Sequence, residues 1–509
     1  KIKELINQNK DKNFIGLGLK EEYYRYYPEK TLAANILGFV TSAGIGQYGI
    51  ESKFNTQLQG KKGVFQTQKD SVGRQITVGE SIIQPAVDGQ DVVLTIDRSI
   101  QMTVEKKLAK AVADYRADNG QVIILEPKTG RIIAMANYPT FDPNSYSAVF
   151  EKDLINLKQE EIAALVPIQN EENTFWFYRN VLTLDRIKIF KETSADGVVV
   201  YKKYKNTFGA EAYQNKGIAQ NYEPGSIFKI VTMASALDDG DVKTSTSFTD
   251  PGFLQLDWNP STKKHDYEIR NVSAKCTGRV NMAWIIQNSC NTGIAQVAQK
   301  MGRNLFYNYI LKFGFTERTE IEFDNESTGK LNPFEKWTDS EFATHAFGQG
   351  MTVTPLQMTV AYSVIANKGV LMQPHIVESI NQKNGKTMVT GSASVQRVVS
   401  EQTANLVTAM LVNNVENGDS YGRMRLPRHY FGAKTGTAQT YRNGKALSGV
   451  GTTIATVLGF APIDNPKFVV LAKLDHPRTV EWADATSGIH LHEIMEYLFD
   501  YYSIPPDKK

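Results

Sequence analysis

Residues 223–229 read Glu223-Pro224-Gly225-Ser226-Ile227-Phe228-Lys229 and lead into the apolar run 230–237. The proline and glycine favour a sharp turn, and the apolar run behind them predicts a buried helix. On such a helix Ser226 and Lys229 share one face, because they stand three positions apart. A serine hydroxyl is a weak nucleophile unless a base lies within hydrogen-bond reach. The stretch therefore predicts a serine nucleophile with the Lys229 amine as its base.

Two further motifs follow, Ser289-Cys290-Asn291 and then Lys434-Thr435-Gly436-Thr437. S-x-x-K, S-x-N and K-T-G in this order outline a serine acyl-transfer site. Each motif alone is weak, since copies also begin at Ser261, Ser327, Ser379 and Lys128. Those copies are flanked by Gly, Pro and Asn or lie between two predicted strands, so they read as loops and hairpin turns. Order and flanking sequence single out the first set.

Composition limits the function classes. The 509 residues exceed one ordinary core and predict two or three domains. With 57 basic and 54 acidic residues the net charge is +3, which argues against nucleic acid as the main partner. The two cysteines predict neither a disulfide framework nor a zinc site, so Cys276 is interpreted as a small hydrophobe or surface thiol and Cys290 receives no chemical role. The seven histidines lack metal-ligand spacing, and we expect no metal and no cofactor.

The order of predicted elements indicates a sheet assembled from both ends of the chain. A domain boundary fits near 88–90, which divides residues 1–88, rich in short strands and turns, from residues 89–509. Hydrophobic periodicity predicts strands and helices at both ends of the second part. The strands are 92–96, 121–125, 131–136, 453–461 and 467–474, and the helices are 100–115 and 488–501. This order predicts an α/β sheet with a helical middle inserted into it.

Residues 151–210 interrupt a connection that would otherwise be short. Residues 150–165 carry apolar residues at helical spacing, and 198–204 have the composition of a strand. We interpret the segment as a surface insertion, and a partner-docking element is the alternative.

At this point the sequence resembles the class B penicillin-binding proteins, the membrane-anchored monofunctional transpeptidases of peptidoglycan synthesis. The resemblance rests on the three motifs with their flanks and on Phe347-Gly348-Gln349-Gly350 with residues 353–357, which look like the stretch that packs behind the family's active site. The segments 25–28, 49–51 and 73–74 resemble its N-terminal pedestal domain. Three departures are Ala433 in place of a commoner glycine, the insertion, and a missing proline in 486–493.

The resemblance implies a penicillin-binding, serine β-lactamase-like transpeptidase domain of α/β (α+β) fold, preceded by a mixed β-rich, dimerisation-like pedestal over 1–88. It implies acyl transfer through Ser226 on stem peptides ending in D-Ala-D-Ala. Lys229 would be the base, with its pKa lowered by burial and by the Lys434 cation. Ser289 would relay a proton, and Asn291 would fix the geometry of Lys229 and the substrate amide.

In the same reading, Lys434 and the substrate-binding residues Thr435, Gly436 and Thr437 hold the terminal carboxylate. The backbone N–H groups of Ser226 and Thr437 would form the oxyanion hole. β-Lactams would acylate Ser226, because they mimic the D-Ala-D-Ala end. A membrane glycosyltransferase of the septal or elongation complex would be the protein partner. The Glu223-Pro224-Gly225 segment is more similar to the septal type.

The family reading places the protein at the plasma membrane with its catalytic domain on the outer side. No apolar run reaches the roughly 18 to 20 residues of a membrane span, and we expect the anchor to precede Lys1. Three alternatives remain open, namely a D,D-carboxypeptidase, a β-lactamase and a catalytically silent cell-wall sensor or scaffold.

Overall fold

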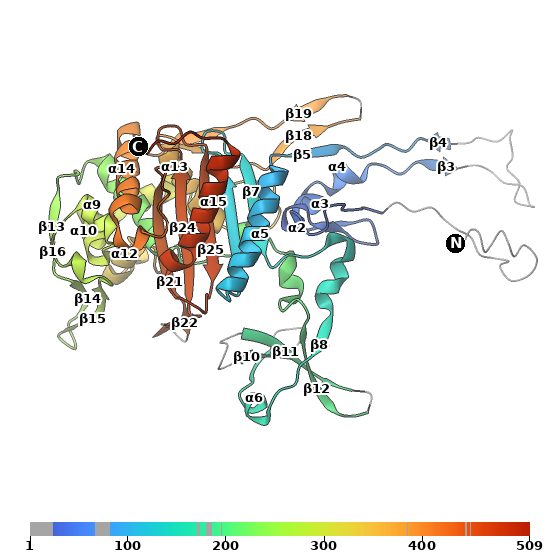
Figure 1. Ribbon diagram of the computed structural model, residues 1–509, viewed down its shortest axis with the longest axis horizontal. Coiled ribbons are helices and arrows are strands. Elements are labelled where there is room, and N and C mark those ends of the chain that lie inside the picture. Colours follow the sequence, from blue (N-terminus) through green and yellow to red (C-terminus); the bar gives the residue numbers. More distant parts are fainter. Residues whose placement is uncertain are drawn as a thin grey trace, which may run out of the picture.

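A five-stranded antiparallel sheet lies at the centre of the computed structural model (Figure 1). The structure describes residues 24–66, 82–169, 174–179, 186–194, 196–383, 385–442, 445–447 and 449–508. The segment 73–74 of the pedestal resemblance lies outside the described residues.

The central sheet has the order β21-β24-β25-β6-β7. Its strands are β6 (Asn119–Leu125), β7 (Ile132–Tyr138), β21 (Gly432–Gln439), β24 (Thr453–Ala461) and β25 (Phe468–Asp475). The predicted assembly from both ends of the chain is therefore confirmed. Every residue of β6 and β25 is buried, because helices cover both faces of the sheet. β21 is an edge strand, and it carries the K-T-G motif.

Helices pack on both faces of this sheet. One face is covered by α5 (Arg98–Asp114) and α15 (Ser487–Tyr501), whose buried apolar side chains form one core with β24 and β25. The other face is covered by α13 (Pro355–Ala366) and α8 (Lys229–Asp239). All residues of α13 are buried, as expected for a helix that is apolar all round. The α/β sheet with covering helices that the sequence predicts is confirmed.

The helical middle of the chain lies beside β21. It comprises α9 (Met282–Gln287), α10 (Asn291–Met301), α11 (Arg303–Lys312), α12 (Asp339–His345) and α14 (Glu401–Asn417). Two small hairpin-like sheets accompany these helices, β13 (Ser247–Asp250) with β16 (Gly278–Asn281) and β14 (Phe253–Asn259) with β15 (Lys264–Arg270). Ser261 lies in the turn between β14 and β15, which agrees with the interpretation of its S-x-x-K copy as loop.

The N-terminal part joins the catalytic part through strands. It contains α2 (Ala34–Leu37), β1 (Phe39–Val40), β2 (Gly46–Gln47), α3 (Gly49–Lys53), α4 (Asn55–Gln59), β3 (Val64–Gln66) and β4 (Ile82–Gln84). β5 (Asp91–Leu94) then pairs with β18 (Val377–Asn381), which also pairs with β19 (Thr387–Val389). The buried carboxylate of Glu51 accepts hydrogen bonds from Arg25 Nε at 2.6 Å and from Tyr27 Oη at 3.2 Å. These contacts tie the first and second pedestal segments together.

The insertion forms a separate five-stranded antiparallel sheet that projects from the body (Figure 1). It runs in the order β8-β12-β11-β10-β9, with one short helix, α6 (Gln159–Ala163). The strands are β8 (Lys152–Leu154), β9 (Val166–Gln169), β10 (Thr174–Arg179), β11 (Arg186–Thr193) and β12 (Val199–Tyr204). The helical pattern predicted over 150–165 is wrong at β8, because pairing with β12 overrides the local periodicity. The predicted strand over 198–204 is confirmed.

Short elements complete the described structure. They are the strands β17 (Val370–Met372), β20 (Ser394–Arg397), β22 (Tyr441–Arg442) and β23 (Lys445–Ala446), with α7 (Lys216–Ala219) and seven 3₁₀ helices. None of the helices formed by the described residues has the length and apolarity that a membrane span requires.

Candidate active site

The S-x-x-K segment that contains Ser226 lies at the start of α8. The 3₁₀ helix η3 (Gly225–Phe228) runs directly into α8. Gly225 adopts φ 59° and donates its N–H to Gly348 O at 3.0 Å. A Cβ on Gly348 would lie 2.5 Å from Gly225 O, so only glycine permits this close approach. The 347–350 stretch thus packs behind the nucleophile as the resemblance implies, and Ser226 stays partly exposed.

Lys229 is fully buried and reaches the S-x-N motif. Its Nζ lies 2.5 Å from Ser289 O, 2.8 Å from Asn291 Oδ1 and 3.1 Å from Ser289 Oγ. Burial first, and the Lys434 cation second, hold the pKa of Lys229 well below its usual range. Once deprotonated, the amine keeps two N–H groups for the carbonyl and amide oxygens. Its lone pair is then available to accept a proton from a neighbouring hydroxyl.

The S-x-N motif lies on a strained turn between α9 and α10. Ser289 has φ 54°, a left-handed conformation that is uncommon for a residue other than glycine. The turn is held by backbone hydrogen bonds from Ser289 N to Ile286 O and from Cys290 N to Ile285 O. Both the carbonyl and the hydroxyl of Ser289 consequently face Lys229.

Cys290 forms a disulfide with Cys276, so the interpretation of the two cysteines as chemically silent is wrong. Their Cα atoms lie 5.5 Å apart although 14 positions separate them in sequence. β16 and α9 fold back between them, and this reversal leaves no spacing pattern that a sequence could reveal. The covalent bond clamps the residue between Ser289 and Asn291.

The K-T-G motif closes the site from the edge strand β21. Lys434 is 1% exposed, and its Nζ donates to Ser289 Oγ at 3.1 Å and to Thr435 O at 3.0 Å. A Cβ on Gly436 would lie 2.9 Å from Pro224 O, so this glycine lets the nucleophile segment lie against the strand. Thr435 and Thr437 are partly exposed, and Thr437 Oγ1 accepts the N–H of Ala483 at 3.0 Å.

The three motifs therefore meet at one hydroxyl group. Ser289 Oγ lies 3.1 Å from each of two buried lysine nitrogens, Lys229 Nζ and Lys434 Nζ. This arrangement can pass a proton between the two amines through Ser289. Tyr421 also reaches the site, because its hydroxyl lies 3.5 Å from Lys434 Nζ and 3.0 Å from Thr435 N. Sequence reasoning missed Tyr421, which stands in no motif.

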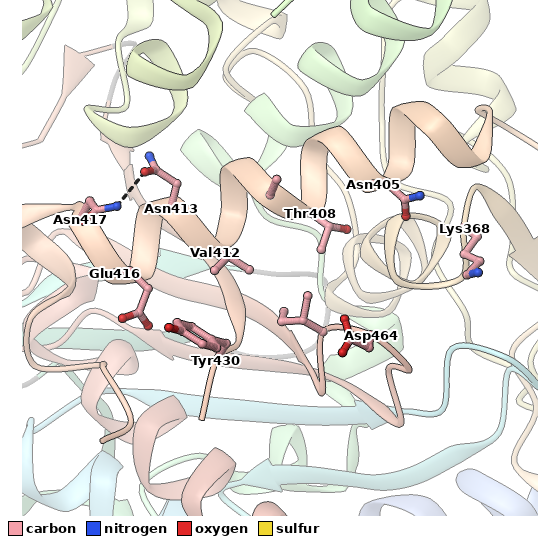
Figure 2. A pocket seen from close by; sticks show the side chains of 11 residues that line it. Lys368, Asn405, Thr408, Val412, Asn413, Glu416, Asn417, Tyr430 and Asp464 are labelled. Carbon is pink, nitrogen blue, oxygen red and sulfur yellow. Dashed lines mark hydrogen bonds between the residues drawn. The ribbon is translucent and has the colours of Figure 1, made fainter. Parts of the chain in front are cut away.

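A second hollow lies on the outer face of α14, away from these residues (Figure 2). Its polar rim includes Asn405, Thr408 and Asn413 of α14, faced by Tyr430 and Asp464. None of the residues of the three motifs lines it. The hollow is therefore distinct from the place where the three motifs meet.

Comparison with known proteins agrees with this geometry. The family described as penicillin binding protein transpeptidase domain matches residues 120–496, and the penicillin-binding protein dimerisation domain matches residues 3–94. The chain belongs to the penicillin-binding protein transpeptidase family. Because it combines the two domains, it is a class B penicillin-binding protein. The predicted family and the serine transpeptidase class of enzyme are confirmed.

Relatives and solved structures cover nearly the whole chain. Stage V sporulation protein D of Bacillus subtilis is 29% identical, over 99% of this chain and 69% of its own length. The peptidoglycan D,D-transpeptidase FtsI of Buchnera aphidicola is 27% identical, over 97% and 72%. Penicillin binding protein 3 of Mycobacterium tuberculosis, solved in complex with aztreonam, has a TM-score of 0.71 at 26% identity, covering 95% of this chain and 91% of that one.

We predict that opening the disulfide destabilises this class B penicillin-binding protein. Closing a loop of about 15 residues corresponds to roughly 3 kcal/mol in the free energy of unfolding, and the Cys276–Cys290 separation is 14. A thermal melt with and without dithiothreitol should show a lower Tm in the reductant. The Cys276→Ala/Cys290→Ala chain is the control, and its Tm should not respond to dithiothreitol. An equal response of both chains would contradict the prediction.

Proposed function

We propose that this protein is a peptidoglycan D,D-transpeptidase in which Ser226 forms the acyl-enzyme. The observation that carries the proposal is the shared Ser289 hydroxyl, which lies between two buried lysines beside the nucleophile segment. The names of the relatives, among them peptidoglycan D,D-transpeptidases, support peptidoglycan as the substrate. The aztreonam and ampicillin complexes of a similar structure support β-lactams as inhibitors of this chain.

In the first step, Ser226 Oγ attacks the penultimate carbonyl of a stem peptide ending in D-Ala-D-Ala. Neutral Lys229 accepts the Ser226 proton, while the backbone N–H groups of Ser226 and Thr437 stabilise the oxyanion. The Ser289 hydroxyl then delivers a proton to the leaving D-Ala. In the second step an amine of a neighbouring stem peptide attacks the ester, and the same groups act in reverse. The amide crosslink forms, and Ser226 regains its proton.

The remaining polar groups position the donor peptide. Asn291 Oδ1 holds the Lys229 amine at 2.8 Å, while its Nδ2 donates to Arg270 O at 3.1 Å. The Lys434 ammonium and the hydroxyls of Thr435 and Thr437 hold the terminal carboxylate, and Gly436 keeps the strand close to the nucleophile. Placing the reacting groups in this way supplies much of the rate enhancement of acyl transfer.

The same proposal extends to the surroundings of the enzyme. The protein acts at the outer side of the plasma membrane, and a membrane glycosyltransferase is its partner. The Glu223-Pro224-Gly225 sequence and the FtsI-named relatives favour the septal complex over the elongation complex. The 1–88 part serves as the pedestal, which is supported by its match to the dimerisation domain.

Ser226→Ala should abolish the covalent penicillin adduct, because the proposed acyl-enzyme forms on the Ser226 hydroxyl. Mass spectrometry of the intact protein after penicillin exposure measures the adduct directly. Ser261→Ala is the matched control, since Ser261 also starts an S-x-x-K sequence but lies in an exposed turn. It should acylate at the normal rate. Persistent labelling of Ser226→Ala would overturn the assignment of the nucleophile.

The pH dependence of acylation should report the Lys229 pKa. The neutral amine is the reactive form, so the acylation rate constant should rise with pH and level off above the lowered pKa of Lys229. Lys434→Met removes the neighbouring cation and raises that pKa, which shifts the rising limb to higher pH. Lys434→Arg keeps the charge and should leave the limb in place. Stopped-flow acylation by a chromogenic β-lactam between pH 5 and pH 10 tests this order. An unshifted limb in Lys434→Met would contradict it.

Product analysis should separate transpeptidation from the alternatives. With a stem peptide and an added amine acceptor, we expect the amide product to grow with amine concentration at the expense of the hydrolysed peptide. Chromatography with mass detection measures the ratio of the two products. Hydrolysis alone would identify a carboxypeptidase, and rapid continuous turnover of nitrocefin would identify a β-lactamase. No acylation at all would favour the silent scaffold.

A further inference from the structure

The hydroxyl of Tyr421 lies at the meeting point of four polar groups. Tyr421 belongs to the short 3₁₀ helix η6 (Asp419–Tyr421), between α14 and β21, and is 2% exposed. Its oxygen lies 3.0 Å from Thr435 N, 3.1 Å from Thr435 Oγ1, 3.3 Å from Asn414 Nδ2 and 3.5 Å from Lys434 Nζ. The proposed reaction does not itself use this phenol.

The donors around the phenol fix the direction of its own proton. Thr435 N and Asn414 Nδ2 can only donate, and these two N–H groups fill the two acceptor positions of the Tyr421 oxygen. The Lys434 ammonium is a third, longer donor. Thr435 Oγ1 is then the one neighbour in these contacts that can accept the phenolic proton. The Thr435 hydroxyl therefore receives a hydrogen bond from Tyr421 and keeps its own proton for another acceptor.

The position of β21 at the edge of the sheet determines where Thr435 can donate its hydroxyl proton. Thr435 N bonds Tyr421 and not β24, so its N–H points toward the open edge of the sheet. Thr437 has the same orientation, because residues two apart on a strand point the same way. Tyr421 thus occupies the edge N–H of Thr435. Thr435, whose hydroxyl receives the bond from Tyr421, is partly exposed.

We propose that Tyr421 is a positioning residue that directs the hydroxyl proton of Thr435 toward the terminal carboxylate of the substrate. This inference rests on the proposed function, in which that carboxylate binds Lys434 and the threonines. A hydroxyl that already accepts one hydrogen bond is a prepared donor for an anion, and the adjacent Lys434 ammonium adds charge. Tyr421 consequently contributes to the preference for substrates that end in a free carboxylate.

Asn414 also holds the hydroxyl of Tyr421 in place. Its side chain is fully buried on α14, and Nδ2 also donates to Ala433 O at 3.2 Å. The Tyr421 ring packs on the backbone at Gly418, where a Cβ would lie 2.8 Å from the ring. Because the ring is held by packing, phenylalanine should fit at this position. Tyr421→Phe then removes the hydroxyl alone.

Tyr421→Phe should discriminate between substrates with and without a carboxylate. The test compares acylation of Ser226 by benzylpenicillin and by its methyl ester, in which the carboxylate is masked. Loss of the oriented hydroxyl donor should slow acylation by benzylpenicillin roughly 10- to 100-fold. Acylation by the ester, which lacks the anion, should change less than about threefold. Stopped-flow rates and a Tm for each variant provide the readouts.

A double-mutant cycle tests whether Tyr421 acts through Thr435. In a Thr435→Val chain, adding Tyr421→Phe should slow benzylpenicillin acylation by less than about threefold, because the directed hydroxyl is already absent. The matched control is Tyr430→Phe in the same loop, whose side chain lines the separate hollow of Figure 2. It should react with both penicillins like the unaltered protein.

The possible results distinguish a failure of the Tyr421 inference from a failure of the proposed function. Equal slowing of both penicillins, additive losses in the cycle, or an unaltered rate in Tyr421→Phe would each overturn the role of Tyr421. In all three cases Ser226 is still acylated, so the proposed function stands. If penicillin fails to acylate the unaltered protein, the proposed function falls and takes this inference with it.

Discussion

Burial of the Lys229 amine is the constraint on which the rest of the site depends. A fully buried ammonium group is costly unless its N–H groups find acceptors, and its charged form is disfavoured. The chain supplies three oxygen atoms, two of them from the strained Ser289 turn. A second buried lysine then lies across the same hydroxyl and disfavours the charge on Lys229 further. Stability alone would not favour two lysines here, whereas the proposed acyl transfer requires a neutral amine at this point.

This electrostatic arrangement requires three segments that are far apart in the sequence to lie close together in the fold. The fold meets that need with a sheet built from both ends of the chain, in which β21 pairs with β24 and no other strand of the described residues pairs with its outer edge. The free edge is what allows N–H and hydroxyl groups to face a substrate. Glycines at 348 and 436 remove the side chains that would otherwise separate the nucleophile segment from its supports. The disulfide between Cys276 and Cys290 fixes the S-x-N segment covalently.

The sequence predicted the parts of this site that are encoded locally. The apolar run after Lys229 located α8, and further apolar runs located the strands of the central sheet. The Cys276–Cys290 bond and the Tyr421 contacts could not be predicted in this way. Both depend on segments brought together by tertiary folding, and neither leaves a periodic pattern. At β8 a local pattern was present but misleading. The pattern predicted a helix, whereas the segment pairs with the strand β12 about 50 positions later.

Two features outside the three motifs, the insertion sheet and Tyr421, differ in what they can alter. The insertion sheet projects from the body, and its strands pair with one another and not with the central sheet. The insertion therefore does not constrain the positions of Lys229 and Lys434. Tyr421 is the reverse case, because a single phenol contacts both Lys434 and Thr435. Because that loop residue decides which hydroxyl proton is free, recognition of the substrate can be tuned by a change outside all three motifs.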